Sequence, residues 1–155
     1  MSPISPIRPI PFFPSVFFVV IFAFFLAAPL SAQARDTVWS ALIFATVSES
    51  PTPPPPEIAA YQQKLQRIFG YNQFQILNQH REPMKGRADW LLPGDGFSLR
   101  IGAQRAQENY VLNIQLYQGK QLAVQTIALL ARQSPIFLRG PLAGDGQIIV
   151  VIAVE

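Results

Sequence analysis

The sequence predicts an α+β domain in which one amphipathic helix packs on a face of a mostly antiparallel sheet of about six to eight strands. Two patterns lead to this fold class: one stripe of apolar residues at helical spacing, and apolar residues that alternate with polar ones over much of the C-terminal half. A third pattern, at the N-terminus, predicts a signal peptide that is cleaved before the domain begins.

Residues 1–34 form the expected signal peptide. Arg8 is their only charged side chain, and Ser15 to Ala28 is a run of fourteen residues without a charge. Ala32 and Ala34 are the small side chains that signal peptidase accepts, so cleavage is predicted between Ala34 and Arg35. The alternative is an uncleaved anchor, but a fourteen-residue helix spans about 21 Å and a bilayer core is about 30 Å thick. We therefore expect no stable membrane insertion after cleavage.

The composition of the 155-residue chain excludes several classes of protein. Without cysteine it has no disulfide scaffold, thiolate zinc site or cysteine nucleophile, and a single histidine excludes a two-histidine metal site within one chain. The formal net charge of +3 is too small to indicate nucleic acid as a partner. No asparagine begins an Asn-X-Ser/Thr acceptor, which favours a bacterial exported protein over a eukaryotic one.

Residues 35–56 contain the first expected strand and a proline-rich connector. Val38 to Val47 is an almost wholly apolar run, which is typical of a strand covered on both faces. Ser48 to Pro56 breaks this pattern, and its four successive prolines favour an extended polyproline conformation. Such a segment can be a ligand for domains with aromatic grooves. A stiff connector that leads into the next helix is the preferred interpretation.

The segment from Glu57 to Gly70 carries the helical pattern. Proline is tolerated at the first position of a helix, an acidic residue suits its positively polarised end, and glycine commonly follows its last turn. The apolar residues at spacings of three and four are expected to face the core: Ile58, Tyr61, Leu65, Ile68 and Phe69. Residues 57–155 are expected to complete a single α+β domain with the strand in 35–56.

Beyond Gly70 the apolar period changes to two, which predicts strands with one face in water. The run 122–130 is apolar on both parities, so we expect it to be bulged or better covered than the others. The fully apolar run 148–154 is expected to lie beside the first strand at the centre of the sheet. The expected strands cover 73–76, 97–102, 110–117, 122–130, 136–138 and 148–154.

Two Gly-Asp-Gly segments, at 94–96 and 144–146, are interpreted as turns between strands. A calcium site would need several oxygen ligands from one compact loop, and neither segment has a second acid close by. The glycine-rich run 140–146 is not a phosphate loop, because an apolar strand and not a helix follows it. We therefore expect no metal and no cofactor.

His80 is the only histidine in the sequence and therefore the only candidate for a histidine general base. A hydrolase would join it to an acid, Glu82 or Asp89, and to a serine from another part of the chain. The serines beyond the leader are Ser40, Ser48, Ser50, Ser98 and Ser134, and none lies in a Gly-X-Ser-X-Gly elbow. This favours a surface-loop histidine. Hydrolysis by carboxylates alone would draw on Asp89, Asp95, Glu108 and Asp145, whose spacing gives no support for it.

Glutamine is frequent at positions expected to face water: Gln73, Gln75, Gln79, Gln104, Gln107, Gln115, Gln118, Gln121 and Gln125. A weakly charged, amide-rich sheet face can bind a polymer or another protein, although ordinary solvated surface is the preferred interpretation. Trp39 and Trp90 are candidate recognition aromatics, and Trp39 is expected to be buried because it lies in the apolar first strand.

No catalytic, cofactor-binding or metal-binding residue is assigned from the sequence. The expected function is that of a non-enzymatic exported domain, periplasmic or secreted, which contacts a protein partner as an accessory component of a cell-envelope assembly. The alternative is a small hydrolase directed at carbohydrate or peptidoglycan through carboxylates. A polar cleft with two or more converging acids would favour the hydrolase, and a flat sheet face with scattered acids would favour the interaction domain.

Overall fold

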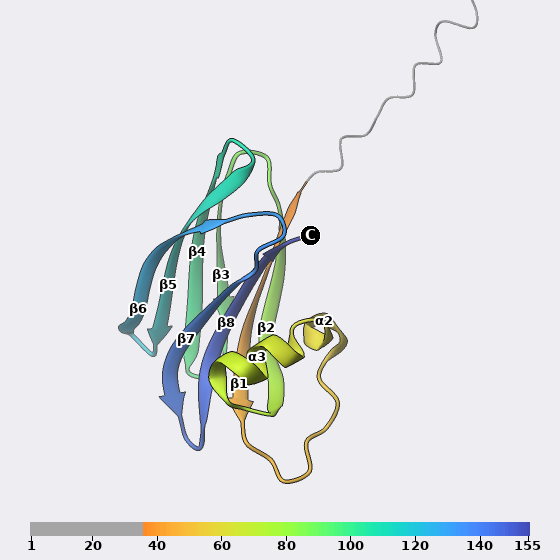
Figure 1. Cartoon of the computed structure of the whole chain (residues 1–155). Helices are drawn as coiled ribbons and strands as arrows, with labels where there is room; N and C mark the ends of the chain where they lie inside the picture. Colours follow the sequence, from red (N-terminus) through yellow and green to blue (C-terminus); the bar gives the residue numbers. More distant parts are fainter. Residues whose placement is uncertain (1–35) are drawn as a thin grey trace, which may run out of the picture. The chain divides into compact units, whose positions relative to one another are not determined.

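The computed structural model describes residues 36–155, so the predicted leader and its cleavage point lie outside the described residues. The strands are β1 (Thr37–Thr46), β2 (Gln73–Pro83), β3 (Arg87–Pro93), β4 (Phe97–Ala106), β5 (Asn109–Gln118), β6 (Gln121–Leu130), β7 (Ile136–Ala143) and β8 (Gly146–Val154). The helices α2 (Pro56–Ala59) and α3 (Gln62–Phe69) lie between β1 and β2. Sheet A has the strand order β2-β1-β8-β7 and sheet B the order β3-β4-β5-β6 (Figure 1).

The predicted α+β fold, a single sheet covered by one amphipathic helix, is wrong. Residues 36–155 form two four-stranded antiparallel sheets that share one core, and the longest helix among them has only eight residues. Such a helix is about 12 Å long, whereas eight strands in one sheet would extend about 34 Å. One short helix cannot cover so wide an apolar surface, and a second sheet therefore covers it.

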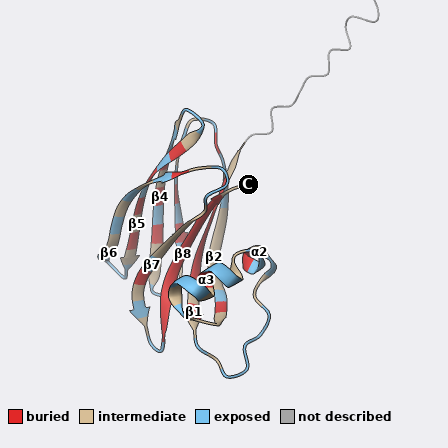
Figure 2. Ribbon diagram, in the orientation of Figure 1, coloured by how far each residue is buried: buried red, intermediate tan, exposed pale blue. Residues whose placement is uncertain are grey.

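The main core lies between the two sheets. Figure 2 shows buried residues along β1 and β8, the two central strands of sheet A. Their expected adjacency is confirmed, since Val38 to Ala45 pair with Gln147 to Val154. Alternate residues of β4 and β5 meet them from sheet B. The fully buried members of this core include Leu42, Leu99, Ile101, Leu112, Ile114 and Ile152.

The helices cover the outer face of sheet A. The expected helix is divided, because α2 ends at Ala59 and α3 begins at Gln62. Ile58 and Leu65 are fully buried against sheet A, whereas Ile68 is 45% exposed, so the apolar stripe is narrower than predicted. Trp39 is buried beneath the helices as expected, and its ring stacks on Tyr61 at a centroid distance of 6.1 Å.

The later strands depart from prediction in several places, and β2 and β7 extend well beyond the expected 73–76 and 136–138. β3 is a strand that the sequence did not indicate, and it forms one edge of sheet B. β6 lies at the opposite edge of that sheet, with an irregularity in its pairing to β5 at Leu116/Tyr117. The bulge was expected, but the better coverage was not found, because most residues of β6 are exposed or half-buried.

The two Gly-Asp-Gly segments form the β3–β4 and β7–β8 turns, as expected. Gly96 and Gly144 have φ angles of +71° and +59°, which glycine adopts without the steric cost that a side chain would add. Asp95 and Asp145 therefore lie on hairpin turns, where their carboxylates are exposed.

Candidate functional site

The outer face of sheet B is the open face of the domain. The corresponding face of sheet A is covered by α2 and α3, but no helix of the described residues packs on sheet B. Several large apolar side chains are consequently exposed there: Leu91, Val111, Leu122, Ile127 and Leu129. A partner that covers these apolar side chains displaces water from them, and few polar groups lose hydrogen bonds to water.

A hollow lies at the middle of this open face, around Gly102. In the strand register Gly102 stands between Asp89 of β3 and Asn113 of β5, and its missing side chain leaves the space between them open. The hollow has a volume of about 390 Å³. Glycine inside a strand commonly marks such a close approach. The other side chains around it are Arg87, Arg100, Gln104, Val111, Gln115 and Ile127, and Ala103 also borders it.

The side chains at the hollow are suited to binding. Arg100 lies 3.7 Å from Asp89, measured between Nε and Oδ1, and both side chains are largely exposed. An ion pair of this kind contributes little to stability and can exchange for contacts to a ligand. The guanidinium groups and the amides donate hydrogen bonds, while Val111 and Ile127 offer apolar contact on the β6 side. The hollow therefore combines polar and apolar recognition.

The acids named for the hydrolase alternative do not come together. Asp89 is the only acid that borders the hollow. Asp95 precedes β4 and Glu108 follows it, so they lie at opposite ends of a ten-residue strand, about 34 Å apart along the strand. Among the described residues no group of three or more histidine, cysteine or acidic side chains is arranged to hold a metal. The open face thus carries one acid at its hollow, and the other three lie in turns.

The serine–histidine alternative meets a different obstacle. His80 lies within β2 and not in a loop, and its Nε2 is 2.8 Å from Glu82 Oε2. Ser40 stands opposite His80 in the register of β1 and β2. However, Ser40 is 0% exposed, and its hydroxyl oxygen accepts a hydrogen bond of 2.9 Å from Trp90 Nε1. A substrate cannot reach this hydroxyl, and Trp90 is a core residue and not an exposed recognition aromatic.

The predicted amide-rich face is divided between the sheets. Gln104, Gln115 and Gln125 share the outer face of sheet B. Gln79 instead lies on sheet A, where its side chain accepts a hydrogen bond from Trp39 Nε1 and donates one to Glu57 at the start of α2. Sequence reasoning therefore found part of the open face but missed its centre, Gly102. The useful signal was a glycine at a water-facing position within an alternating strand.

A second polar cluster fastens the beginning of the described chain. Asp36 Oδ2 accepts hydrogen bonds from the Tyr110 hydroxyl at 2.6 Å and from Arg132 Nη2 at 2.8 Å. The Tyr110 bond and then the Arg132 guanidinium lower the pKa of Asp36, although burial opposes them. Burial, with the bond to Asp36, raises the pKa of Tyr110. All of these groups are satisfied within the cluster, which therefore serves as a structural clamp.

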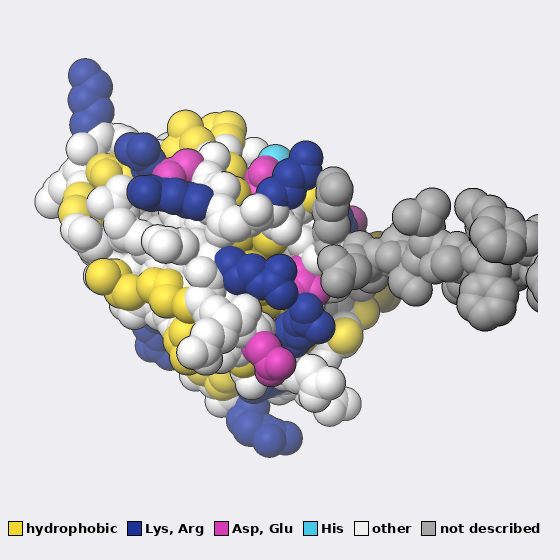
Figure 3. Space-filling model, turned by 90° about the horizontal axis from the view of Figure 1, so that it is seen from above, with side chains coloured by type: hydrophobic (Ala, Val, Ile, Leu, Met, Phe, Trp, Pro, Cys, Tyr) yellow, Lys and Arg dark blue, Asp and Glu magenta, His cyan; other side chains and the backbone are white. Residues whose placement is uncertain are grey.

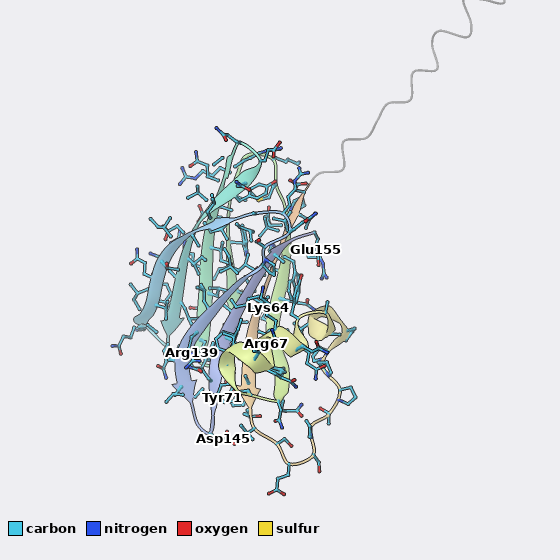
Figure 4. All side chains as sticks on the ribbon, viewed as in Figure 1. Lys64, Arg67, Tyr71, Arg139, Asp145 and Glu155 are labelled. Carbon is cyan, nitrogen blue, oxygen red and sulfur yellow. The ribbon has the colours of Figure 1, made fainter. Side chains whose placement is uncertain are left out.

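Basic side chains beside α3 are likewise engaged with the fold. Figure 4 labels Lys64 and Arg67 along α3 and Arg139 on the neighbouring β7. Lys64 Nζ lies 5.1 Å from the Phe137 ring centroid, and Arg139 lies 5.4 Å from the Phe69 ring centroid. These cation–π contacts hold the helix on sheet A. Figure 3 shows basic, acidic and apolar side chains interspersed at one end of the domain.

No helix within residues 36–155 has the length and hydrophobicity needed to cross a bilayer. Comparison with known proteins gives no significant match to a protein-family model, to a curated protein or to a solved structure.

Proposed function

We propose that the protein is a non-enzymatic, exported interaction domain that binds a protein partner of the cell envelope on the open face of sheet B. The single observation that carries the proposal is the hollow around Gly102, which has donors and apolar side chains at its border but only one carboxylate. Retaining and inverting glycoside hydrolases both need a pair of carboxyl groups. The hollow is therefore suited to binding and not to hydrolysis.

The asymmetry of the two outer faces supports the same proposal. Burial of an apolar sheet face stabilises a fold, and sheet A achieves it with α2 and α3. Sheet B leaves Leu91 59% and Ile127 74% exposed at either side of the hollow. Protein-binding surfaces combine apolar side chains with hydrogen-bonding groups. A partner seated on this face would cover both.

Filling the hollow tests the proposal. Gly102→Val adds a β-branched side chain that strands favour, and the first added carbon would lie 3.3 Å from Asp89 Oδ1. Ser98→Val is the matched control, because Ser98 lies on the same face of β4 but outside the hollow. A photo-crosslinker at Asn113 should capture an envelope protein, and the purified partner should bind Gly102→Val at least tenfold more weakly than wild type or Ser98→Val.

Two results would contradict this function. Equal binding by Gly102→Val and wild type would remove the hollow from the interface. Turnover of peptidoglycan or an oligosaccharide that disappears in Asp89→Asn would show an enzyme.

Export is tested separately by the mass of the mature protein, whose N-terminus should be Arg35. Retention of residues 1–34 would replace the released domain by an anchored one.

A further inference from the structure

The four edge strands of the two sheets are not equally protected against pairing with another strand. Edge strands usually carry charges, proline or irregular pairing, because their free backbone groups can bind another chain. β2 contains Arg81 and Glu82 and has a pairing irregularity opposite Leu42/Ile43. β3 has only seven residues, with Arg87 and Asp89 among them. β7 contains Arg139 and Pro141 and an irregular pairing to β8.

β6 has almost none of these protections. Its ten residues, Gln121 to Leu130, include no charged residue and no proline. Within residues 36–155 it pairs with β5 alone, and its one irregularity lies at the Leu122 end. Alternate residues of β6 therefore direct their N–H and C=O groups away from β5, toward solvent.

The side chains of β6 make this edge apolar as well as unpaired. Ile127 and Leu129 point to the outer face of sheet B and are 74% and 62% exposed. Val111 lies beside Leu129 on β5, so the apolar surface continues inward from the edge. The charged residues of the same face are Arg87 and Asp89 on the far edge strand β3 and Arg100 on the neighbouring β4. The open face is thus apolar toward β6 and charged toward β3.

We propose that the free edge of β6 pairs, antiparallel, with β6 of a second copy of this chain. In an antiparallel pair about a two-fold axis, the residue nearest the axis opposes its own counterpart, and the other residues oppose those equally far on the other side of the axis. An uncharged strand therefore brings no like charges together, wherever along it the axis lies. β6 is such a strand. Of the two flanking cations, Arg132 donates two hydrogen bonds to Asp36, and Lys120 lies in the β5–β6 turn, outside the strand. β2, β3 and β7 each contain charged residues, which would meet their own counterparts wherever the axis lies at one of them.

Pairing would join two copies of sheet B into one continuous eight-stranded sheet. A two-fold axis perpendicular to the sheet keeps the outer faces of both copies on the same side, so the apolar halves of the two faces become neighbours. Ile127 and Leu129 then approach Ile127 and Leu129 of the second copy. A ten-residue antiparallel pair would also form about ten backbone hydrogen bonds. The two hollows at Gly102 would open on the same side of the assembly.

The oligomeric state of the purified protein tests this proposal, and the test needs no ligand for the hollow. Analytical ultracentrifugation of wild type should give the mass of two chains. Ile127→Lys should increase the dimer dissociation constant at least tenfold, because two ammonium groups then meet near the axis. Leu142→Lys is the matched control: Leu142 is 69% exposed on β7, away from the proposed interface. Leu91→Lys tests the far edge of the same face, and both controls should remain dimeric.

Cysteine cross-linking gives a second readout. The chain contains no cysteine, so one introduced at position 125, 127 or 129 can form a disulfide only with another copy. Opposed residues in an antiparallel pair have Cα atoms about 4.5–5.5 Å apart, within disulfide reach. We expect rapid oxidation at one of these positions and none for Leu142→Cys.

Two results would overturn the proposal. One is a monomer at all concentrations without cross-linking, and the other is a dimer abolished by Leu91→Lys but not by Ile127→Lys. Cross-linking of position 127 to a different protein would assign the edge to that partner instead.

Discussion

The hydrogen bond between Trp90 and Ser40 joins the two sheets through the core, and its removal should be measurable. Ser40 belongs to β1 and Trp90 to β3, and the indole Nε1 donates to the serine Oγ at 2.9 Å. Ser40→Ala deletes the acceptor while the indole N–H stays buried. An unsatisfied buried donor costs about 1–3 kcal/mol. We therefore expect the free energy of unfolding to fall by about 2 kcal/mol.

A double-mutant cycle isolates this bond. Trp90→Phe removes the donor, so a further Ser40→Ala change no longer leaves a buried N–H without an acceptor. The loss of unfolding free energy caused by Ser40→Ala should therefore be smaller in this background by at least about 1 kcal/mol. Urea unfolding, followed by circular dichroism, gives the four free energies. Ser134→Ala, at an exposed position, should change stability by less than about 0.5 kcal/mol.

The outcome also separates a structural serine from a catalytic one. A loss below about 0.5 kcal/mol for Ser40→Ala, or an equal loss in the Trp90→Phe background, would refute the reasoning about the buried donor. A stable Ser40→Ala variant that has lost the turnover of a substrate would instead identify Ser40 as a nucleophile. We expect lower stability and no catalytic difference.

Three further predictions concern the clamp, a turn and strand β7. Because the pKa of Asp36 is lowered in the folded state, its stabilising effect is complete above the unfolded value of about 4 and is lost as the pH falls through the folded value. Asp36→Asn should therefore lower the free energy of unfolding by about 1.5–3 kcal/mol at pH 7. The variant should also lose less stability than wild type as the pH falls, which urea unfolding at pH 3, 5 and 7 measures. Parallel pH profiles for the two proteins would contradict this. Gly144→Ala places its Cβ in open space but at φ +59°, so it should cost about 1–2 kcal/mol. A Cβ at Gly140 would lie 2.7 Å from Leu116 Cδ2 and 2.9 Å from the Ile148 carbonyl oxygen. Gly140→Ala should therefore lower the free energy of unfolding at least as much, by about 1–3 kcal/mol. A clearly smaller loss of thermal stability for Gly140→Ala than for Gly144→Ala would count against the steric argument.

The positions of most strands could be predicted because alternation depends only on which side of one strand is buried. The assembly of the strands could not, because it depends on contacts between distant residues. Asp36 and Tyr110 are 74 positions apart, and no local pattern joins them. β3 was missed because Trp90, Leu91 and Leu92 are successive apolar residues and do not show the period of a strand.

The candidate site shows the same division. Arg100, Gly102 and Gln104 alternate with core residues of β4, so the sequence places them on one face. Their neighbours across the sheet, Asp89 and Asn113, follow only from the register of β3, β4 and β5. The hollow is therefore a property of strand pairing: Gly102 marks its centre within β4, but the residues that border it on β3 and β5 are set by the register.

β6 is the element whose sequence pattern and position disagree most. Its apolar residues occur on both parities, as in β1 and β8, and those two strands do occupy the centre of sheet A. β6 instead lies at an edge, with Ile127 and Leu129 in water. Local pattern and global fold agree in most of a natural protein, and their conflicts gather at functional positions. A further strand against the free edge would give β6 the neighbours on both sides that its pattern indicates, and the folded monomer alone does not supply one.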